Sequence, residues 1–307
     1  MTLYSAIARK LALDAVVIID GGTGTEIQNR GVHMSGETWC AEANLTHPDV
    51  VRGVHADYVD AGAELIIANT FATSPLLFEY LGRTPEVASI DRAALELARQ
   101  AAGGRVPVAG SFSTMRPVQK GTDRTSRQQR WSKPAAIDLF RRKADGLAKA
   151  GADLIVMEMM RDADYSLWAT DAAVATGLPV WVGLSVEVGP DGDLRGFGRP
   201  DCRLEDFLAP LSETGVDVLA IMHSSPEDTT RTIPIVKERW KGPLCCYPES
   251  GYFTMPDWQF VDIIPAPELV KLARSWVGQG VRIIGGCCGI GPEHVRALAQ
   301  ELGAGRR

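Results

Sequence analysis

The sequence lacks any hydrophobic run long enough to cross a membrane. No apolar stretch in its 307 residues approaches the roughly 20 residues that a membrane-spanning helix requires. The segment Met1–Arg9 also lacks the apolar stretch and the small-residue cleavage site of a signal peptide. We therefore expect a cytoplasmic protein that has no membrane partner.

An excess of positive charge is missing as well. The chain has 32 Lys and Arg against 38 Asp and Glu, a formal net charge of −6, which argues against general binding to nucleic acid or to anionic membranes. Six cysteines are too few for a disulfide framework in a chain of this length, so we expect reduced thiols. The remaining composition, 45% hydrophobic and 23% charged, is typical of a globular protein.

No repeat, linker or low-complexity segment divides the chain, but short apolar runs alternate regularly with segments of helical pattern. The runs are almost continuously hydrophobic, as in parallel strands that are covered on both faces. The expected strands are Ala15–Asp20, Glu64–Asn69, Val106–Gly110, Asp153–Glu158, Pro179–Leu184, Val216–Met222, Pro243–Tyr247 and Val281–Gly285. The expected helices are Asp49–Ala61, Pro85–Ala102, Pro134–Ala150, Tyr165–Ala175, Leu204–Glu213, Pro226–Trp240, Pro267–Gln279 and Pro292–Leu302.

Eight strand–helix units predict an α/β fold, a single (β/α)8 TIM barrel, which typically takes about 250 residues. We interpret residues 1–307 as one domain. An open, doubly wound sheet is the alternative, but Gly21-Gly22-Thr23-Gly24 lacks the full spacing of a dinucleotide-binding loop. The polar and basic segment Ser111–Ser132 is expected to form a long loop over the barrel mouth, with Arg116, Lys120, Arg124, Arg127 and Arg130.

The C-terminal ends of the strands predict where a site would lie, because barrel enzymes place their catalytic residues there. Asp20 and Glu158 each end a strongly apolar strand, where an unpartnered carboxylate would be desolvated. A pair of carboxylates across a pocket suits the ammonium group of a substrate. The alternatives are that Asp20 caps a helix and that Glu158 pairs with Arg161.

Two adjacent cysteines, Cys287 and Cys288, follow the last expected strand between glycines. Neighbouring cysteines rarely satisfy disulfide geometry, whereas two thiolates at a strand end are good ligands for zinc. His223 ends another expected strand on the same face and would complete a Cys2His zinc set with an open fourth position. Alternatively, the cysteines are small buried side chains and the histidine belongs to the core.

These residues resemble the homocysteine S-methyltransferase family, whose members are zinc-dependent (β/α)8 enzymes. The resemblance extends over almost the whole chain. It implies a methyltransferase that moves a methyl group from a sulfonium or other activated donor to a thiol, most simply homocysteine, giving methionine. The motifs that carry it are Asp20 to Glu26, Asn69-Thr70-Phe71, Gly110-Ser111, Glu158, Tyr247 to Gly251 and Gly285 to His294.

The resemblance also implies residue roles. Zn2+ would be held by His223, Cys287 and Cys288, although the family has a cysteine, usually after an asparagine, where this chain has Met222-His223. Asp20 and Glu158 would hold the amino group of homocysteine, and backbone N–H groups around Gly22 to Thr25 its carboxylate. The full set of expected substrate-binding residues is Asp20, Gly22, Thr23, Thr25, Glu26, Trp39, Asn69, Thr70, Ser111 and Glu158.

The methyl donor is the less determined substrate. Trp39 lies where betaine-using relatives place a cation-facing aromatic ring, but Ser74 and Met159 stand near the positions of their tyrosines. We therefore expect a small sulfonium donor. The alternatives are an anionic donor bound by the basic loop, a changed acceptor, a corrinoid-protein partner, and a non-catalytic barrel that binds thiols or metal or responds to oxidants. An oligomer is compatible with the sequence.

Overall fold

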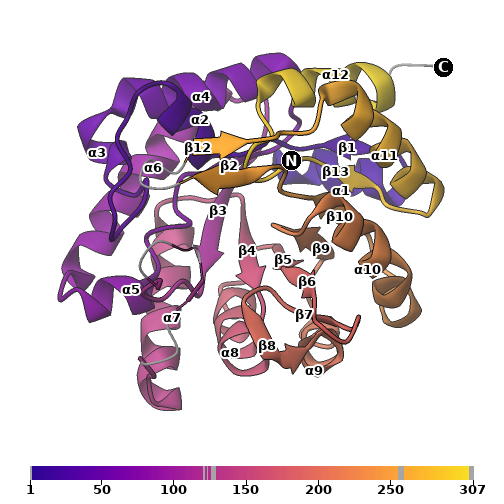
Figure 1. Cartoon of the computed structure of the whole chain (residues 1–307). Coiled ribbons are helices and arrows are strands. Elements are labelled where there is room, and N and C mark those ends of the chain that lie inside the picture. Colours follow the sequence, from indigo (N-terminus) through magenta and orange to yellow (C-terminus); the bar gives the residue numbers. More distant parts are fainter. Residues whose placement is uncertain (1, 120–121, 123, 126–128, 255–258, 304–307) are drawn as a thin grey trace.

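The computed structural model describes residues 2–119, 122, 124–125, 129–254 and 259–303 (Figure 1). At its centre is an eight-stranded sheet in the order β1-β13-β10-β9-β5-β4-β3-β2, with parallel pairing throughout. Helices surround this sheet. The strands are β1 Val17–Ile18, β2 Ile66–Ala68, β3 Val108–Ser113, β4 Leu154–Met160, β5 Val180–Leu184, β9 Val218–Met222, β10 Leu244–Tyr247 and β13 Ile283–Ile284.

The first and last strands of this order, β1 and β2, are joined by hydrogen bonds. The Glu64 N–H donates to the Ile18 carbonyl at 2.7 Å, and the Asp20 N–H donates to the Leu65 carbonyl at 3.2 Å. The carboxylate of Asp20 adds a third link, because its Oδ2 accepts the N–H of Ile67 at 2.7 Å. These bonds close the sheet into the predicted (β/α)8 barrel.

All eight expected strands and all eight expected helices occur. The hydrogen-bonded strands are mostly shorter than the apolar runs, whereas β3 and β4 extend further, to Ser113 and Met160. The helices that follow the strands are α4 Pro48–Ala61, α6 Val87–Ala102, α7 Lys133–Lys149, α8 Ala163–Val174, α9 Leu204–Ser212, α10 Pro226–Arg239, α11 Ala266–Gly278 and α12 Pro292–Leu302.

Several elements were not predicted. The glycine-rich segment after the first strand is not wholly a loop, because helix α2 begins at Thr23 with Gly22 as its N-cap. This also excludes Asp20 as the cap of that helix. The other additional elements are α1 Tyr4–Ala12, α2 Thr23–Asn29, α3 Ala43–Thr46, α5 Pro75–Tyr80, η1 Thr84–Glu86, β6 Val186–Val188, β7 Leu194–Gly196, β8 Arg199–Arg203, β11 Tyr252–Thr254 and β12 Gln259–Val261.

Side chains of the barrel strands alternate between two hydrophobic clusters, as the pleat of a strand requires. Val17 and Ile19 lie in the cluster that fills the barrel, whereas Ile18 lies in the cluster between the sheet and the helices. Cys245 and Cys246 divide in the same way, and both are fully buried. Both cysteines are therefore core residues, and they lie on opposite faces of the sheet.

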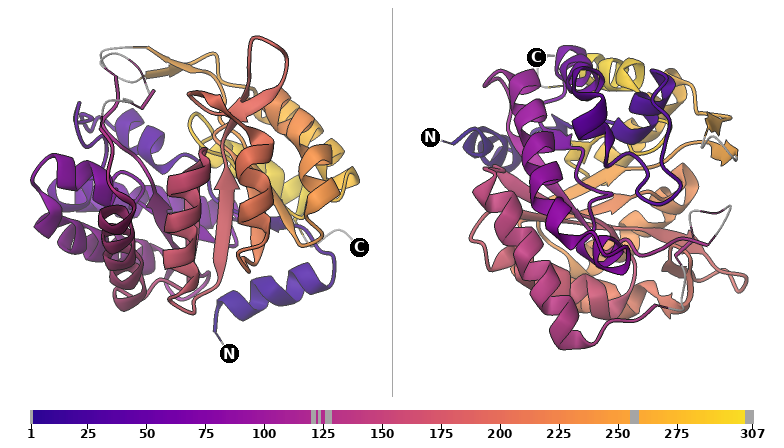
Figure 2. Two further views of the ribbon diagram at one scale, coloured as in Figure 1. Left: turned by 90° about the horizontal axis from the view of Figure 1, so that it is seen from below. Right: turned by 90° about the vertical axis from the view of Figure 1, so that its left-hand side faces the viewer.

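Helix α1 closes the N-terminal end of the barrel. The indole Nε1–H of Trp181 donates to the hydroxyl of Tyr4 at 3.1 Å, and the two rings meet edge to face with centroids 6.4 Å apart. Ile7 is buried in the cluster that fills the barrel. Figure 2 (left) shows α1 at one end of the barrel and the hairpins β6–β8 and β11–β12 at the other. A ligand must therefore enter at the C-terminal ends of the strands.

The basic segment Ser111–Ser132 begins inside β3 and then leaves the sheet. Two of its arginines are paired within the protein: Arg116 with the buried Asp162 at 2.8 Å, and Arg124 with Glu187 at 2.7 Å. Lys120 and Arg127 lie outside the described residues. In the part of the chain that the structure describes, no helix has both the length and the apolar character needed to cross a bilayer.

Helix α4 contains a buried histidine, His55, that makes no side-chain hydrogen bond to a described residue. His55 is fully buried, and neither of its ring nitrogens is hydrogen bonded to a described residue. Burial lowers the pKa of His55 from 6.5 to about 4. His55 is therefore protonated more easily in the unfolded chain than in the folded protein. The free energy of unfolding is unaffected above the unfolded-state pKa, and it decreases as the pH falls from the unfolded-state pKa to the folded-state pKa.

We expect the substitution His55→Leu to reduce the acid sensitivity of folding. Between about pH 7.5 and about pH 5, the wild type should lose about 2 kcal/mol more unfolding free energy than the variant. Urea unfolding at the two pH values measures the difference, and His33→Leu, at an exposed position, is the control. An equal loss in His55→Leu and the wild type would show that His55 does not titrate in this way.

Candidate active site

A pocket opens at the C-terminal end of the barrel, between the loops that follow the strands. This is the position predicted from the polar residues that follow the strands in the sequence. Of the residues that the sequence indicated, the pocket is lined by Gly22, Thr23, Trp39, Asn69, Glu158, His223, Cys287 and Cys288.

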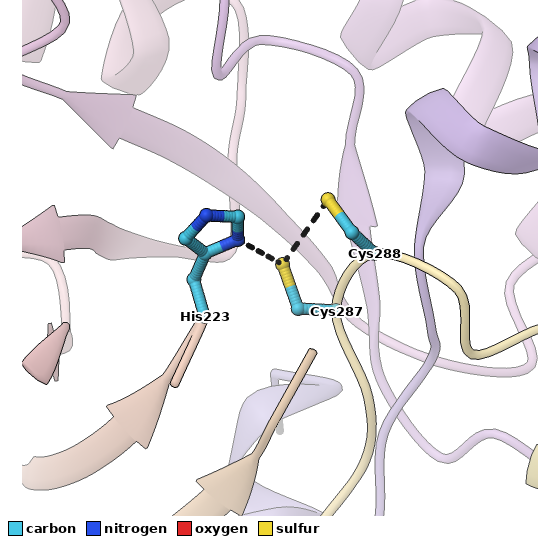
Figure 3. A group of neighbouring side chains, drawn as sticks. All are labelled: His223, Cys287 and Cys288. Atoms are coloured by element: carbon cyan, nitrogen blue, oxygen red, sulfur yellow. Dashed lines mark hydrogen bonds between the residues drawn. The ribbon is translucent and has the colours of Figure 1, made fainter. Parts of the chain in front are cut away.

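Three potential metal ligands converge within this pocket (Figure 3). The Sγ atom of Cys287 lies 3.9 Å from the Sγ atom of Cys288 and 3.6 Å from Nδ1 of His223. All three ligand atoms lie within 4.8 Å of one another, and no other such group occurs among the described residues. The structure thus brings together the three residues that the sequence predicted as a metal site.

The two distances from the Sγ atom of Cys287 fit a tetrahedral metal ion. Zinc bonded at ordinary lengths would separate two sulfur ligands by about 3.8 Å, and a sulfur from a nitrogen by about 3.6 Å. The chemistry fits as well. The neighbouring thiol of Cys288, together with burial, raises the pKa of Cys287 well above its ordinary value. A bound divalent cation would reverse that effect by stabilising the thiolates.

His223 reaches this position through an unusual backbone conformation. Its φ of 43° lies in the left-handed region, which histidine adopts more readily than most residues. Its carbonyl accepts the hydroxyl of Ser185 at 2.9 Å, and its ring meets Phe197 edge to face at 4.9 Å. Phe197 stands between β7 and β8, so this small sheet helps to orient the imidazole.

The turn that carries the two cysteines is tied to the loop after β10. The N–H of Cys287 donates to the Pro248 carbonyl at 2.8 Å, and the Ser250 N–H donates to the Cys288 carbonyl at 2.9 Å. Gly289 has a φ of 80°, and a Cβ atom there would lie 2.2 Å from the Ser250 carbonyl oxygen. Only glycine therefore allows the turn and the loop to approach this closely.

Glu249 is a further neighbour of this group; it belongs to the motif Tyr247 to Gly251, and no role was predicted for it. Its Oε2 lies 3.2 Å from Nδ1 of His223. It follows β10, whose C-terminal end faces the same mouth as β9 and β13. Its position after a strand was the sequence signal that could have identified it. In the structure, its carboxylate lies beside the imidazole of His223.

The two predicted carboxylates lie in the wall of the barrel mouth. Glu158 lines the pocket, and the hydroxyl of Ser111 donates to its Oε2. Burial raises the pKa of Glu158 to about 7. Asp20 is buried behind the lining, and burial, with the nearby charge of Glu158, raises its pKa well above the ordinary value. A cation entering the pocket would stabilise both carboxylates.

Five of the expected substrate-binding residues are not in the pocket lining: Asp20, Thr25, Glu26, Thr70 and Ser111. Two of them make hydrogen bonds to neighbouring backbone groups. The Thr25 hydroxyl donates to the Gly22 carbonyl at 2.9 Å and accepts the Gly289 N–H at 3.4 Å. The Thr70 hydroxyl donates to the Ser111 carbonyl at 2.8 Å. Direct contact of these five with a substrate stays a prediction.

Several of the side chains that line the pocket are aromatic or carry a thioether. Trp39 and Phe71 meet edge to face with centroids 6.0 Å apart, and Met115, Met159 and Phe260 also line the pocket. Aromatic faces attract cations, and onium groups in particular. The pocket therefore combines a metal-ligand group, buried carboxylates and a wall suited to an onium ion.

Comparisons with known proteins agree with this arrangement. The sequence profile described as homocysteine S-methyltransferase matches residues 17–302. Betaine–homocysteine S-methyltransferase 1 from Mus musculus is 29% identical over 318 residues, which cover 96% of this chain and 74% of the relative. An S-methylmethionine–homocysteine S-methyltransferase from Pongo abelii is 30% identical and covers 96% of this chain and 81% of the relative.

Solved structures confirm the fold. The metallated form of the homocysteine methyltransferase MmuM from Escherichia coli has a TM-score of 0.77 at 24% identity, and it covers 97% of this chain and 99% of that one. The apo form of the same enzyme has a TM-score of 0.69 and covers 95% of this chain and 98% of that one.

The geometry of the three ligands predicts one divalent metal ion per chain after purification without added metal. We expect His223→Ala and Cys287→Ala each to lower metal affinity by more than about 100-fold, because even changes outside the ligands cost about 10–100-fold. Elemental analysis measures occupancy, and the thiolate-to-cobalt absorbance of the cobalt-substituted protein reports ligation.

Cys202→Ala provides the control, since Cys202 is buried in β8 and belongs to no such group. Full metal retention in His223→Ala would place the third ligand elsewhere and leave His223 as a residue of the pocket wall.

Proposed function

The chain belongs to the homocysteine S-methyltransferase family, and from this premise we propose that it transfers a methyl group from a small sulfonium donor to homocysteine, giving methionine. The observation that carries the proposal is the convergence of His223, Cys287 and Cys288 beside a buried carboxylate in one pocket. We place the reaction in the cytoplasm, where thiol ligands stay reduced.

We assign zinc to the metal site, because two thiolates and an imidazole in tetrahedral geometry are typical zinc ligands. Zinc bound there would lower the pKa of the acceptor thiol, so that the acceptor is a thiolate at neutral pH. Three protein ligands leave one coordination position for that sulfur.

Glu158 is the residue of the pocket wall that we assign to the amino group of homocysteine. Its carboxylate is buried and accepts a hydrogen bond from Ser111. An entering ammonium group would supply the charge-assisted hydrogen bonds that replace the water lost on burial. Asp20 lies close enough to Glu158 for the two charges to interact, so an ammonium group beside Glu158 would also be attracted by Asp20. The N–H of Gly22 already donates to the Ile290 carbonyl at 2.9 Å, which leaves Thr23 and Gly24 for the substrate carboxylate.

Trp39 and Phe71 are the residues that we assign to the donor. A sulfonium centre against their rings would present a methyl group to the acceptor sulfur, which forms the new carbon–sulfur bond as the donor's methyl–sulfur bond breaks and a neutral sulfide leaves. Betaine is disfavoured because the expected tyrosines are absent: Ser74 is buried with its hydroxyl donating to the Met115 carbonyl at 2.6 Å, and Met159 takes the other position.

The test is turnover with defined substrates. Metal-loaded protein with homocysteine should form methionine at least about tenfold faster from S-methylmethionine than from betaine or a methylated folate. In the same assay, Glu158→Gln should raise the KM for homocysteine by about tenfold or more, since a charge-assisted hydrogen bond is lost. Glu205→Gln, at an exposed position, is the matched control.

Equal rates from betaine or folate would reject the sulfonium assignment. An unchanged KM for homocysteine in Glu158→Gln would reject that residue as the ammonium partner. If metal-loaded protein forms no methionine from any donor, the proposed activity itself is wrong.

The histidine ligand leads to a further prediction. Two thiolates and a neutral imidazole leave a zinc site without net charge, whereas three thiolates would give it one negative charge. A substrate sulfur in the neutral site should have a lower pKa and be less nucleophilic. We therefore expect His223→Cys to raise the single-turnover rate by about threefold for each unit by which the thiol pKa rises.

Rapid quenching measures that rate, and pH titration of substrate binding gives the thiol pKa, both at matched zinc content. An equal or slower rate in His223→Cys with full zinc would contradict the charge argument.

A further inference from the structure

A buried ion pair lies outside the pocket, between helices α6 and α7. Nζ of Lys143 is 2.7 Å and 2.8 Å from the two carboxylate oxygens of Asp91. The side chains are 0% and 2% exposed, and neither residue lines the pocket. The cost of desolvating the two charges offsets most of their attraction, so apolar residues of similar volume would often stabilise a fold equally well. The remaining contacts of the two charges therefore indicate what they do.

Lys143 uses the rest of its ammonium group to hold the turn that follows β2. Nζ donates to the Thr73 hydroxyl at 2.7 Å and to the Thr70 carbonyl at 3.2 Å. The Thr73 hydroxyl lies 2.8 Å from the Thr70 carbonyl and 2.5 Å from Oδ1 of Asp91, and its single proton can be donated to one of them at a time. Together with the bonds to Asp91, these contacts satisfy an ammonium group with three donors. The turn that they fix carries Phe71 into the pocket.

Asn69, at the start of the same turn, extends the network to Trp39. Its Nδ2 donates to the Cys40 carbonyl at 3.0 Å, and its Oδ1 accepts the Cys40 thiol at 3.0 Å. Trp39 precedes Cys40, has a φ of 47° and meets Phe71 edge to face. The two rings come from different loops, and Asn69 joins the two loops. Helix α6 packs against β2, the strand that leads into this turn.

We propose that Asp91 and Lys143 are positioning residues for the Trp39–Phe71 wall, and that they set the affinity for the methyl donor from outside the barrel. A buried ammonium has donors in fixed directions, so it holds the turn at residues 70–73 in one place, whereas an apolar pair would fill the space without holding the turn. That this wall binds a methyl donor rests on the proposed function, whereas the positioning of the two rings does not.

The double variant Asp91→Leu, Lys143→Met tests this, since it removes both charges and leaves neither one buried alone. We expect it to fold and to keep its metal and its KM for homocysteine, while the KM for the sulfonium donor rises by about tenfold or more and kcat changes by less than about twofold. Arg142→Met is the matched control, because Arg142 is exposed on the same helix in an ion pair with Asp138.

Fluorine NMR of protein labelled with fluorotryptophan provides a readout without turnover. The Trp39 resonance, identified by its loss in Trp39→Phe, should shift or broaden in the double variant, while those of the buried Trp181 and Trp276 stay in place. If the double variant does not fold, Thr73→Val removes the hydroxyl that joins the turn to Lys143 and Asp91 while both charges of the ion pair remain, and it should move the same resonance.

An unchanged Trp39 resonance together with an unchanged donor KM, in a folded variant, would overturn the proposal. A displaced Trp39 resonance in a protein that transfers no methyl group from any donor would reject the proposed function and retain the positioning role.

Discussion

The closure of the barrel between β1 and β2 is the constraint on which the rest of the structure depends. Asp20 takes part in it twice, through its N–H to the Leu65 carbonyl and through its carboxylate to the Ile67 N–H. Because the ring is closed, the ends of the first and last strands meet at one mouth, which brings Cys287 and His223 to the same pocket as Glu158. An open sheet would separate residues of β1 from those of β2 by its full width.

Much of this arrangement could be predicted because strand ends are visible in the sequence. His223, Cys287 and Glu158 each follow an apolar run, and the barrel rule brings such residues together. The direction of each side chain is not visible. Asp20 turns to a backbone N–H in the wall, and Glu249 reaches the imidazole of His223, through contacts that form only after the barrel closes. The sheet β6–β8 was missed because tertiary packing holds it: a Cβ atom on Gly196 would lie 1.9 Å from the Arg161 carbonyl oxygen.

Backbone strain is concentrated at the pocket. Trp39, Met159 and His223 all have positive φ angles and all line it. Each such conformation costs on the order of 1–3 kcal/mol and persists only where other contacts impose it. The Ser185 hydroxyl holds the His223 carbonyl, and the Met222 thioether accepts the Met159 N–H at 3.1 Å. The chain thus gives up some stability to direct one ligand and the surfaces beside it into the cavity.

The two buried pairs of titratable groups differ in whether each group has a partner of opposite charge. Asp91 has Lys143 at hydrogen-bonding distance, so the pair is satisfied without any ligand and can hold a turn in place. Asp20 and Glu158 are both acidic, and burial raises the pKa of each. An ammonium group that enters beside them restores their ionised forms, whereas a simple alkyl thiol does not. In the proposed reaction, the carboxylates would therefore favour a thiol that carries an amino group over a simple alkyl thiol.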